Sequence, residues 1–289
     1  MKRWAATTGW VSLLALGCLD TSAYGPEGFH CDTDADCEAP TYCFRQRCAL
    51  ASDVPVKPGP GNTGVPPDVT LTVSGGLDVQ EDGTVIDGLD IQGCVQVRAS
   101  NVTIRNSRIR CSSYYVILMD DDASNLLVED VEIDGAGFGE SIAFPVSHAV
   151  GRRLNIHHAG RGANLGTGTR LEGSYIHDLS GESVNAVVSY GGRGIVITGN
   201  TLVSHPGGPG TALNMDGALG ALADVDIQRN WLSGGSPTAA LGGGRDGTTG
   251  VALHHNRIER QEDAAPWNLR SGAVQYENVW DDTGEEIRD

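Results

Sequence analysis

The residues of this chain whose types and spacing could do chemistry lie in the stretch LEGSYIHDLSGESVNAVVSY. His177 and Asp178 are adjacent, and Glu182 follows shortly after them. An imidazole changes charge near neutral pH, and a neighbouring carboxylate can orient it for general acid or base catalysis. We therefore predict His177, Asp178 and Glu182, together with Arg161, as candidate catalytic residues. The alternative is one polar turn of a repetitive scaffold.

Blocks of eight residues with alternating apolar positions recur along the chain, and these elements must position the candidate residues. They begin at residues 84, 102, 126, 149, 169, 195, 225, 251 and 273. A short strand cannot bury its apolar face alone, so stacked rungs would share one continuous core. The spacing of 18 to 30 residues fits three short strands per turn. The pattern predicts an all-β fold, a parallel β-helix of about nine rungs over 68–282, with a C-terminal tail at 283–289.

The repeat would place polar residues one above another where each block ends. One predicted column runs through adjacent rungs, and beside it Asp178 stacks on His158. The column consists of Arg110, Asp134, His157 and His177. This stripe could bind a sugar or transfer protons, or it could be a ladder of turns facing water. The candidate substrate-binding residues are Arg110, Asp134, His157, His158, Asn185, Tyr190, Asn214 and Asp216.

Two further residue types support the stacking. Cys94 and Cys111 follow the starts of adjacent blocks by ten and nine residues. Stacked rungs would bring them within the Cα separation of a disulfide, roughly 4.4–6.8 Å. We predict a Cys94–Cys111 disulfide, and a free buried pair is the alternative. Asn recurs at the sixth block position, where its side chains can form a ladder. These residues are Asn200, Asn230, Asn256 and Asn278.

Residues 1–17 have the features of a lipoprotein-type signal peptide. Lys2 and Arg3 precede an apolar run that is too short to span a bilayer. The run ends in ALGC, where a small residue before Cys18 is typical of a bacterial lipobox. We predict lipidation at Cys18, which would anchor an extracytoplasmic protein to a membrane. Ordinary secretion with cleavage near Ala23 is the alternative.

A Cys-rich module is predicted over 18–50, followed by a Pro- and Gly-rich linker over 51–67. The module contains Cys31, Cys37, Cys43 and Cys48. Their spacing lacks the close CxxC pairs of zinc sites. In an exported chain, the four residues are expected to form two disulfides, with three possible connectivities.

The charge of the chain limits its partners. The formal net charge is −17, and Lys2 and Lys57 are its only lysines. Phosphate backbones would repel so acidic a chain, so nucleic-acid binding is disfavoured. The Asp run at 120–122 could help to bind Ca²⁺, and a solvated turn is the alternative. We expect no other cofactor, no metal site and a monomer.

Several stretches resemble the secreted right-handed parallel β-helix proteins of the pectate-lyase-like superfamily, of the type found in actinobacteria and myxobacteria. They are GPGNTGVP at 59–66, GTVIDGLDIQGCVQV at 83–97, NVTIRNSRI at 101–109, LLVEDVEIDG at 126–135, SYIHDL at 174–179 and ENVWDDTG at 277–284. The wider group contains pectate and alginate lyases, polygalacturonases, epimerases and phage tailspikes. The resemblance therefore implies a carbohydrate-facing protein, although fold does not fix the reaction.

The resemblance also limits the reaction. Lyases of this group use a Lys or Arg base, and residues 58–289 contain no Lys, which excludes a lysine-base lyase. The arginine candidates are Arg152, Arg153, Arg161, Arg193 and Arg245. The GHG signature of polygalacturonase-type hydrolases is absent, and ESVNAVVS stands where similar chains carry an HNDGIQ-like segment. The NMDG stretch, with Asn214 and Asp216, could partly substitute for that segment.

Two functional expectations follow from the sequence. The first is an exported protein that binds or cleaves an extracellular polysaccharide along one lateral face. If it cleaves the polymer, it would be a lyase or a glycoside hydrolase. The alternative is a non-catalytic surface lipoprotein, a spacer or an adhesin, with a degenerate active site.

Overall fold

The computed structural model describes residues 41–44, 47–50, 56–182, 184–262 and 264–288. The predictions for the signal peptide, Cys18, Cys31 and Cys37 lie outside these residues. The chain divides into two compact units, Met1–Val54 and Pro55–Asp289. In the first unit, β1 (Thr41–Phe44) pairs antiparallel with β2 (Arg47–Leu50), and Cys43 lies opposite Cys48. The disulfides of this module stay a prediction.

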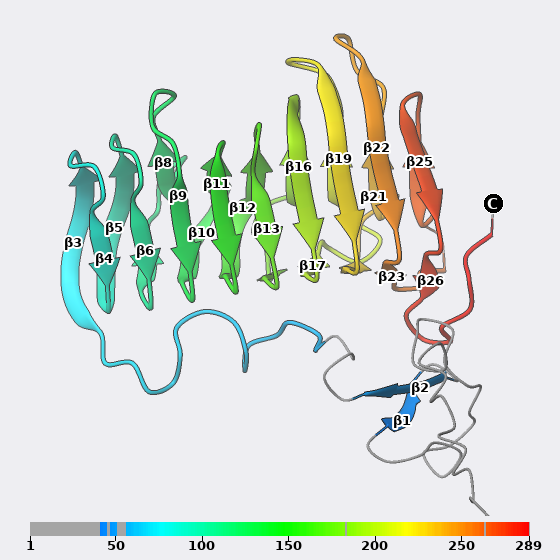
Figure 1. The fold of residues 1–289 in the computed structure, drawn as a ribbon, viewed down its shortest axis with the longest axis horizontal. Coiled ribbons are helices and arrows are strands. Elements are labelled where there is room, and N and C mark those ends of the chain that lie inside the picture. The colour runs from blue at the N-terminus through cyan, green and yellow to red at the C-terminus, as the bar shows by residue number, and fades with distance from the viewer. Residues whose placement is uncertain (1–40, 45–46, 51–55, 183, 263, 289) are drawn as a thin grey trace, which may run out of the picture. The chain divides into compact units, whose positions relative to one another are not determined.

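The second unit consists of parallel strands in stacked sheets, and its described residues contain no helix. One sheet has nine strands, and each strand pairs with that of the next rung. They are β4 (Val85–Asp87), β6 (Thr103–Arg105), β9 (Leu126–Glu129), β11 (Ala149–Arg152), β13 (Arg170–Glu172), β16 (Gly192–Thr198), β19 (Leu222–Gln228), β22 (Thr248–His254) and β25 (Ala273–Tyr276). Each strand overlaps one of the nine predicted blocks, although β16, β19 and β22 begin three residues before theirs, and Figure 1 shows the strands side by side. The predicted all-β fold with parallel, stacked strands is confirmed.

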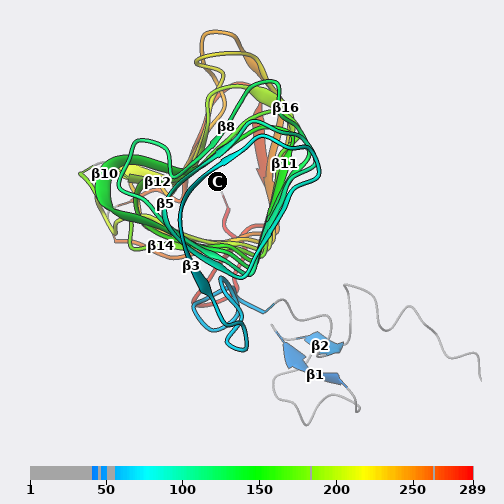
Figure 2. The same cartoon turned by 90° about the vertical axis from the view of Figure 1, so that its left-hand side faces the viewer.

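A second sheet of 15 strands forms the rest of each turn. It consists of β3 (Thr72–Val79), β5 (Leu89–Val97), β7 (Arg108–Arg110), β8 (Ile117–Met119), β10 (Glu132–Val146), β12 (Asn155–Leu165), β14 (Tyr175–His177), β15 (Val184–Ser189), β17 (Thr201–Val203), β18 (Gly210–Met215), β20 (Trp231–Ser233), β21 (Ala239–Leu241), β23 (Arg257–Ile258), β24 (Trp267–Leu269) and β26 (Val279–Trp280). The long strands β5 and β12 each pair with two different strands of the following rung, so the sheet divides into two ladders. Figure 2 looks along the stack and shows the turns lying over one another.

A column of apolar side chains fills the interior of the stack. Ile91, Ile109, Ile133, Ile156 and Ile176 are register partners on successive strands, and all are 0% exposed. Burying each such side chain contributes roughly 1.5–3 kcal/mol relative to leaving it exposed. The column explains the recurring apolar residue of each block, because every rung must present one to the rungs on both sides.

The asparagine ladder and the disulfide both lie where the sequence places them. Nδ2 of Asn200 donates to Oδ1 of Asn230 at 2.9 Å, and the same bond continues to Asn256 and then to Asn278 at 3.0 Å each. All four side chains are fully buried, so the bonds satisfy amides that water cannot reach. A disulfide joins Cys94 and Cys111, whose Cα atoms lie 5.0 Å apart. The predicted Cys94–Cys111 bond is confirmed.

Both ends of the repeat carry additional chain. The described part of the predicted linker, residues 56–67, lies against the stack, where Gly64 N donates to Arg153 O at 2.8 Å. After the last rung, Ile287 is buried and its N–H donates to Asn278 O at 2.8 Å. No helix among the described residues is long and apolar enough to cross a membrane.

Candidate functional site

The predicted polar column is present in the register of the second sheet. Asp134 on β10 pairs with Arg110 on β7 and with His157 on β12, and His157 pairs with His177 on β14. Asp178 follows His177, and its carbonyl oxygen accepts from His158 N at 3.0 Å. The structure therefore brings these candidates together at one corner of the stack, where the short strands β7 and β14 end and the long strands β10 and β12 continue.

Two adjacent histidines converge at this corner instead of pointing to opposite faces. His158 has a φ of 53°, a left-handed conformation that swings its side chain toward that of His157. Their Nδ1 atoms lie 2.9 Å apart. Oδ1 of Asp134 lies 3.2 Å from His158 Nδ1 and 3.9 Å from His157 Nδ1. All three ligand atoms lie within 4.8 Å of one another, and no other such group occurs among the residues that the structure describes.

Glu132 holds the far side of the His157 ring. Its Oε1 lies 3.3 Å from His157 Nε2, and its Oε2 accepts from Arg108 Nε at 3.0 Å. These hydrogen bonds, that from His157 above all, outweigh the effect of burial and lower the pKa of Glu132 to about 2. Glu132 is therefore an ionised acceptor, so a neutral His157 carries its proton on Nε2 and presents the lone pair of Nδ1 to His158.

The ring of His177 has partners at both nitrogens. Nε2 lies 2.8 Å from Asn155 Oδ1, and Nδ1 lies 2.7 Å from Asp178 Oδ2. The ring also stacks on Tyr175, with centroids 4.0 Å apart. Burial lowers the pKa of His177, and the carboxylate of Asp178 opposes that effect only in part. Asn155 and Asp178 thus hold the ring in place, whereas the Asp178 side chain is itself 75% exposed.

The other two catalytic candidates lie apart from this pair. Arg161 pairs in register with Asn185 on β15 and lines a hollow of about 280 Å³ with Tyr114 and Glu140. Its Nε is buried and has no hydrogen-bond partner among the described residues. Asn185 Oδ1 accepts from Thr211 N and Oγ1 at 3.1 and 2.9 Å. Glu182 is exposed before β15, and within the described part of the chain it makes no hydrogen bond or ion pair with His177.

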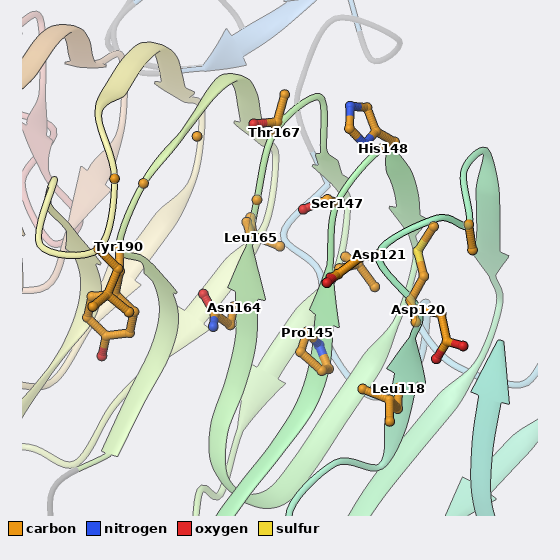
Figure 3. A pocket seen from close by; sticks show the side chains of 18 of the residues that line it. Leu118, Asp120, Asp121, Pro145, Ser147, His148, Asn164, Leu165, Thr167 and Tyr190 are labelled. Atoms are coloured by element: carbon orange, nitrogen blue, oxygen red, sulfur yellow. The ribbon is translucent and has the colours of Figure 1, made fainter. Parts of the chain in front are cut away.

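A larger groove lies at another corner of the stack, and Figure 3 shows it from close by. It has a volume of about 580 Å³. Tyr190 lies at one end, Asp120 and Asp121 lie at the other, and Asn164 points into the space between them. The lining comes from five rungs of the stack. The ends of β8, β10 and β12 and the segments that follow them contribute, and so do the segments that follow β15 and β18.

The groove contains only one of the predicted binding residues, Tyr190. Asn214 lies in the register column that runs from Pro145 through Asn164 and Val188, but it does not line the groove. Asp216 accepts a hydrogen bond from Ala218 N at 3.0 Å and so closes the turn after β18. Sequence reasoning also singled out Asp120 and Asp121, as part of a run that could help to bind Ca²⁺. It missed Ser147, Asn164 and Thr167, because these residues lie outside the repeated blocks.

Comparisons with models of protein families, with curated proteins and with solved structures found no match. The function is therefore argued from the residues and their geometry.

Proposed function

We propose that this chain is an exported right-handed parallel β-helix protein of the pectate-lyase-like type, and that its groove binds an extracellular polysaccharide. The nine parallel rungs and the motifs of the β-helix resemblance support the fold assignment. The signal-like N-terminus and the paired cysteines support export, with lipidation at Cys18 as the anchor to a membrane.

The length and lining of the groove carry this proposal. Five rungs at a strand spacing of about 4.8 Å give a groove on the order of 20 Å long, which suits a chain-like ligand. Tyr190 offers an aromatic face for the CH groups of a sugar ring. Asn164, Ser147 and Thr167 offer amide and hydroxyl groups for sugar hydroxyls.

The charge of the groove favours an uncharged polymer. Asp120 and Asp121 line it, and no Lys or Arg is among the lining residues. A uronate chain would meet these carboxylates on a protein whose formal net charge is already −17. The proposed ligand is therefore a neutral polysaccharide, in contrast to the uronic acid polymers on which pectate and alginate lyases act.

The contacts of the catalytic candidates favour a protein that binds a polysaccharide without cleaving it. Both nitrogens of His177 already have partners, so neither is free to take a proton from a substrate. An arginine base would need a lowered pKa, whereas the hydrogen bond from Arg153 to Asp130 raises the pKa of Arg153. These observations support the alternative of a surface protein that holds a polymer and does not cut it.

The test is a binding screen of the full-length chain against neutral and uronic-acid polysaccharides, followed by calorimetry on the best ligand. Replacing Tyr190 by Ala should weaken binding at least about tenfold, because stacking on an aromatic ring is lost. Tyr276→Ala is the matched control, since Tyr276 is 45% exposed on β25 and does not line the groove. A stronger preference for uronates, equal effects of the two variants, or reducing ends released from the polymer would overturn the proposal.

A further inference from the structure

We infer that Asp134, His157 and His158 form a binding site for one late first-row divalent cation such as Zn²⁺. The site lies at the histidine corner, and none of its three residues lines the groove. It goes beyond polysaccharide binding and does not depend on it.

The donor set and its spacing fit such an ion. Tetrahedral bonds of about 2.0–2.1 Å place zinc ligand atoms roughly 3.4 Å apart. The three distances between Nδ1 of His157, Nδ1 of His158 and Oδ1 of Asp134 are 2.9, 3.2 and 3.9 Å, which bracket that value. Two imidazoles and one carboxylate suit Zn²⁺, Co²⁺ or Fe²⁺, whereas Ca²⁺ prefers a shell of oxygen ligands.

The surroundings orient the ligands in the way that metal sites require. A ligating histidine commonly gives its other N–H to a carboxylate, which fixes the ring and the tautomer. Glu132 does this for His157 at Nε2 and leaves the Nδ1 lone pair facing the proposed ion. Oδ1 of Asp134 also accepts from Ala136 N at 2.8 Å, and Arg110 Nε lies 3.5 Å from its Oδ2. The carboxylate is thus held from two sides.

One side of the proposed metal site faces solvent, because two of its ligands are largely buried and the third is exposed. The side chains of Asp134 and His157 are 10% and 13% exposed, whereas that of His158 is 52% exposed. The ion would therefore have three protein ligands and one position facing solvent. Catalytic zinc sites share this arrangement of three protein ligands and an open position, while structural sites have four protein ligands.

A second histidine pair in the same chain provides an internal control. His254 and His255 also have facing Nδ1 atoms, 2.8 Å apart, and His255 shares the left-handed conformation of His158, with φ values of 54° and 53°. Their carboxylate partners, Asp226 and Glu277, contact the Nε2 atoms on the far sides of the rings. Among the described residues this pair therefore has no third ligand beside its Nδ1 atoms, and the geometry predicts no comparable site.

The experiment is isothermal titration calorimetry of the untagged full-length chain with Zn²⁺, after dialysis against a chelator. One ion per chain is expected to bind. His158→Ala and Asp134→Asn should each weaken binding at least about tenfold. His255→Ala should bind as the unaltered chain does, and it is matched to His158→Ala because the two side chains are 51% and 52% exposed. Circular dichroism establishes that each variant is folded.

Three outcomes would overturn the inference. The first is that the unaltered chain does not bind Zn²⁺ at about 1 mM. The second is unchanged binding by the folded His158→Ala and Asp134→Asn variants, and the third is an equal loss of Zn²⁺ affinity in His255→Ala.

Glu132→Gln tests the positioning role of Glu132, because it keeps the shape of the side chain and removes the charge. Its Zn²⁺ affinity should fall about tenfold while the stoichiometry stays at one, and an unchanged affinity would remove Glu132 from the site. Ca²⁺ should neither bind at this corner nor displace Zn²⁺.

Discussion

Asn230 shows how much a single buried amide does in a stack of rungs. Its Nδ2 donates to Ile197 O and Asn256 Oδ1, and its Oδ1 accepts from the backbone and side-chain N–H groups of Asn200. Replacing Asn230 by Ala leaves several buried polar groups without partners, each worth about 1–3 kcal/mol. We expect the free energy of unfolding, measured by urea denaturation, to fall by roughly 2–4 kcal/mol.

The control for this change is Asn268→Ala. Asn268 is exposed on β24, so its loss should alter the free energy of unfolding by no more than about 0.5 kcal/mol. Similar effects of the two substitutions would contradict a stabilising role for the ladder.

The position of His177 follows from the sequence, but the contacts of its ring do not. Its column with His157 was predictable, because parallel rungs of similar length place equivalent residues side by side. Its ring partners, Asn155 and Asp178, depend on side-chain rotamers that the repeat does not determine. The convergence of the His157 and His158 side chains could not be predicted either, because it depends on the left-handed backbone conformation of His158.

Among the elements of the stack, the Cys94–Cys111 disulfide ties the middle of β5 to the residue that follows β7, with a sequence separation of 17. Closing a loop of this length restricts the unfolded chain and contributes about 3 kcal/mol in the chain-entropy model. The Cys94→Ser, Cys111→Ser double variant should therefore be less stable by about 2–4 kcal/mol in urea denaturation.

Reduction offers an independent check of the same bond. A reducing agent should lower the stability of the unaltered chain toward that of the double variant and leave the double variant unchanged. If the unaltered chain and the double variant unfold at the same urea concentration, the bond does not stabilise the stack.

The elements themselves were predictable, and the groove that they frame was not. Alternating apolar residues identify the strands, because only one face of each strand reaches the core. The groove depends on the turns after β8, β10, β12, β15 and β18, whose lengths vary from rung to rung. Tyr190 was singled out, whereas Asn164 and Ser147 carry no signal in the repeat. Their positions become clear only when five turns are placed side by side.

In the second unit as a whole, residues outside the repeat cover the C-terminal end of the stack. Among the described residues the last rung is followed by chain that does not repeat the pattern, and the ends of such stacks need caps. Ile287, 5% exposed, packs with the core, and Val279 forms an antiparallel bridge with Glu286. The predicted C-terminal tail is thus part of the packed structure, and so is the described part of the predicted linker, which reaches the last rung through Lys57 and Asp281.

Asp281 should make the stability of this unit depend on pH. Burial alone would raise its pKa, but hydrogen bonds and charge from Arg257 and Lys57 outweigh burial and hold the pKa below its ordinary value. A carboxyl whose folded pKa is depressed stabilises the fold fully above its unfolded pKa, about 3.9, and loses that contribution as the pH falls through the folded value. Asp281→Asn should therefore lower the free energy of unfolding by about 1–2 kcal/mol at pH 7, and the difference from the unaltered chain should shrink below about pH 4. Urea denaturation at several pH values measures this difference.

Asp282→Asn is the control for Asp281→Asn, because Asp282 and its partner Arg260 are both about half exposed, and such pairs contribute little. A difference for Asp281→Asn that stays constant down to about pH 2 would show that the charge of Asp281 is not what joins Lys57 to the last rung.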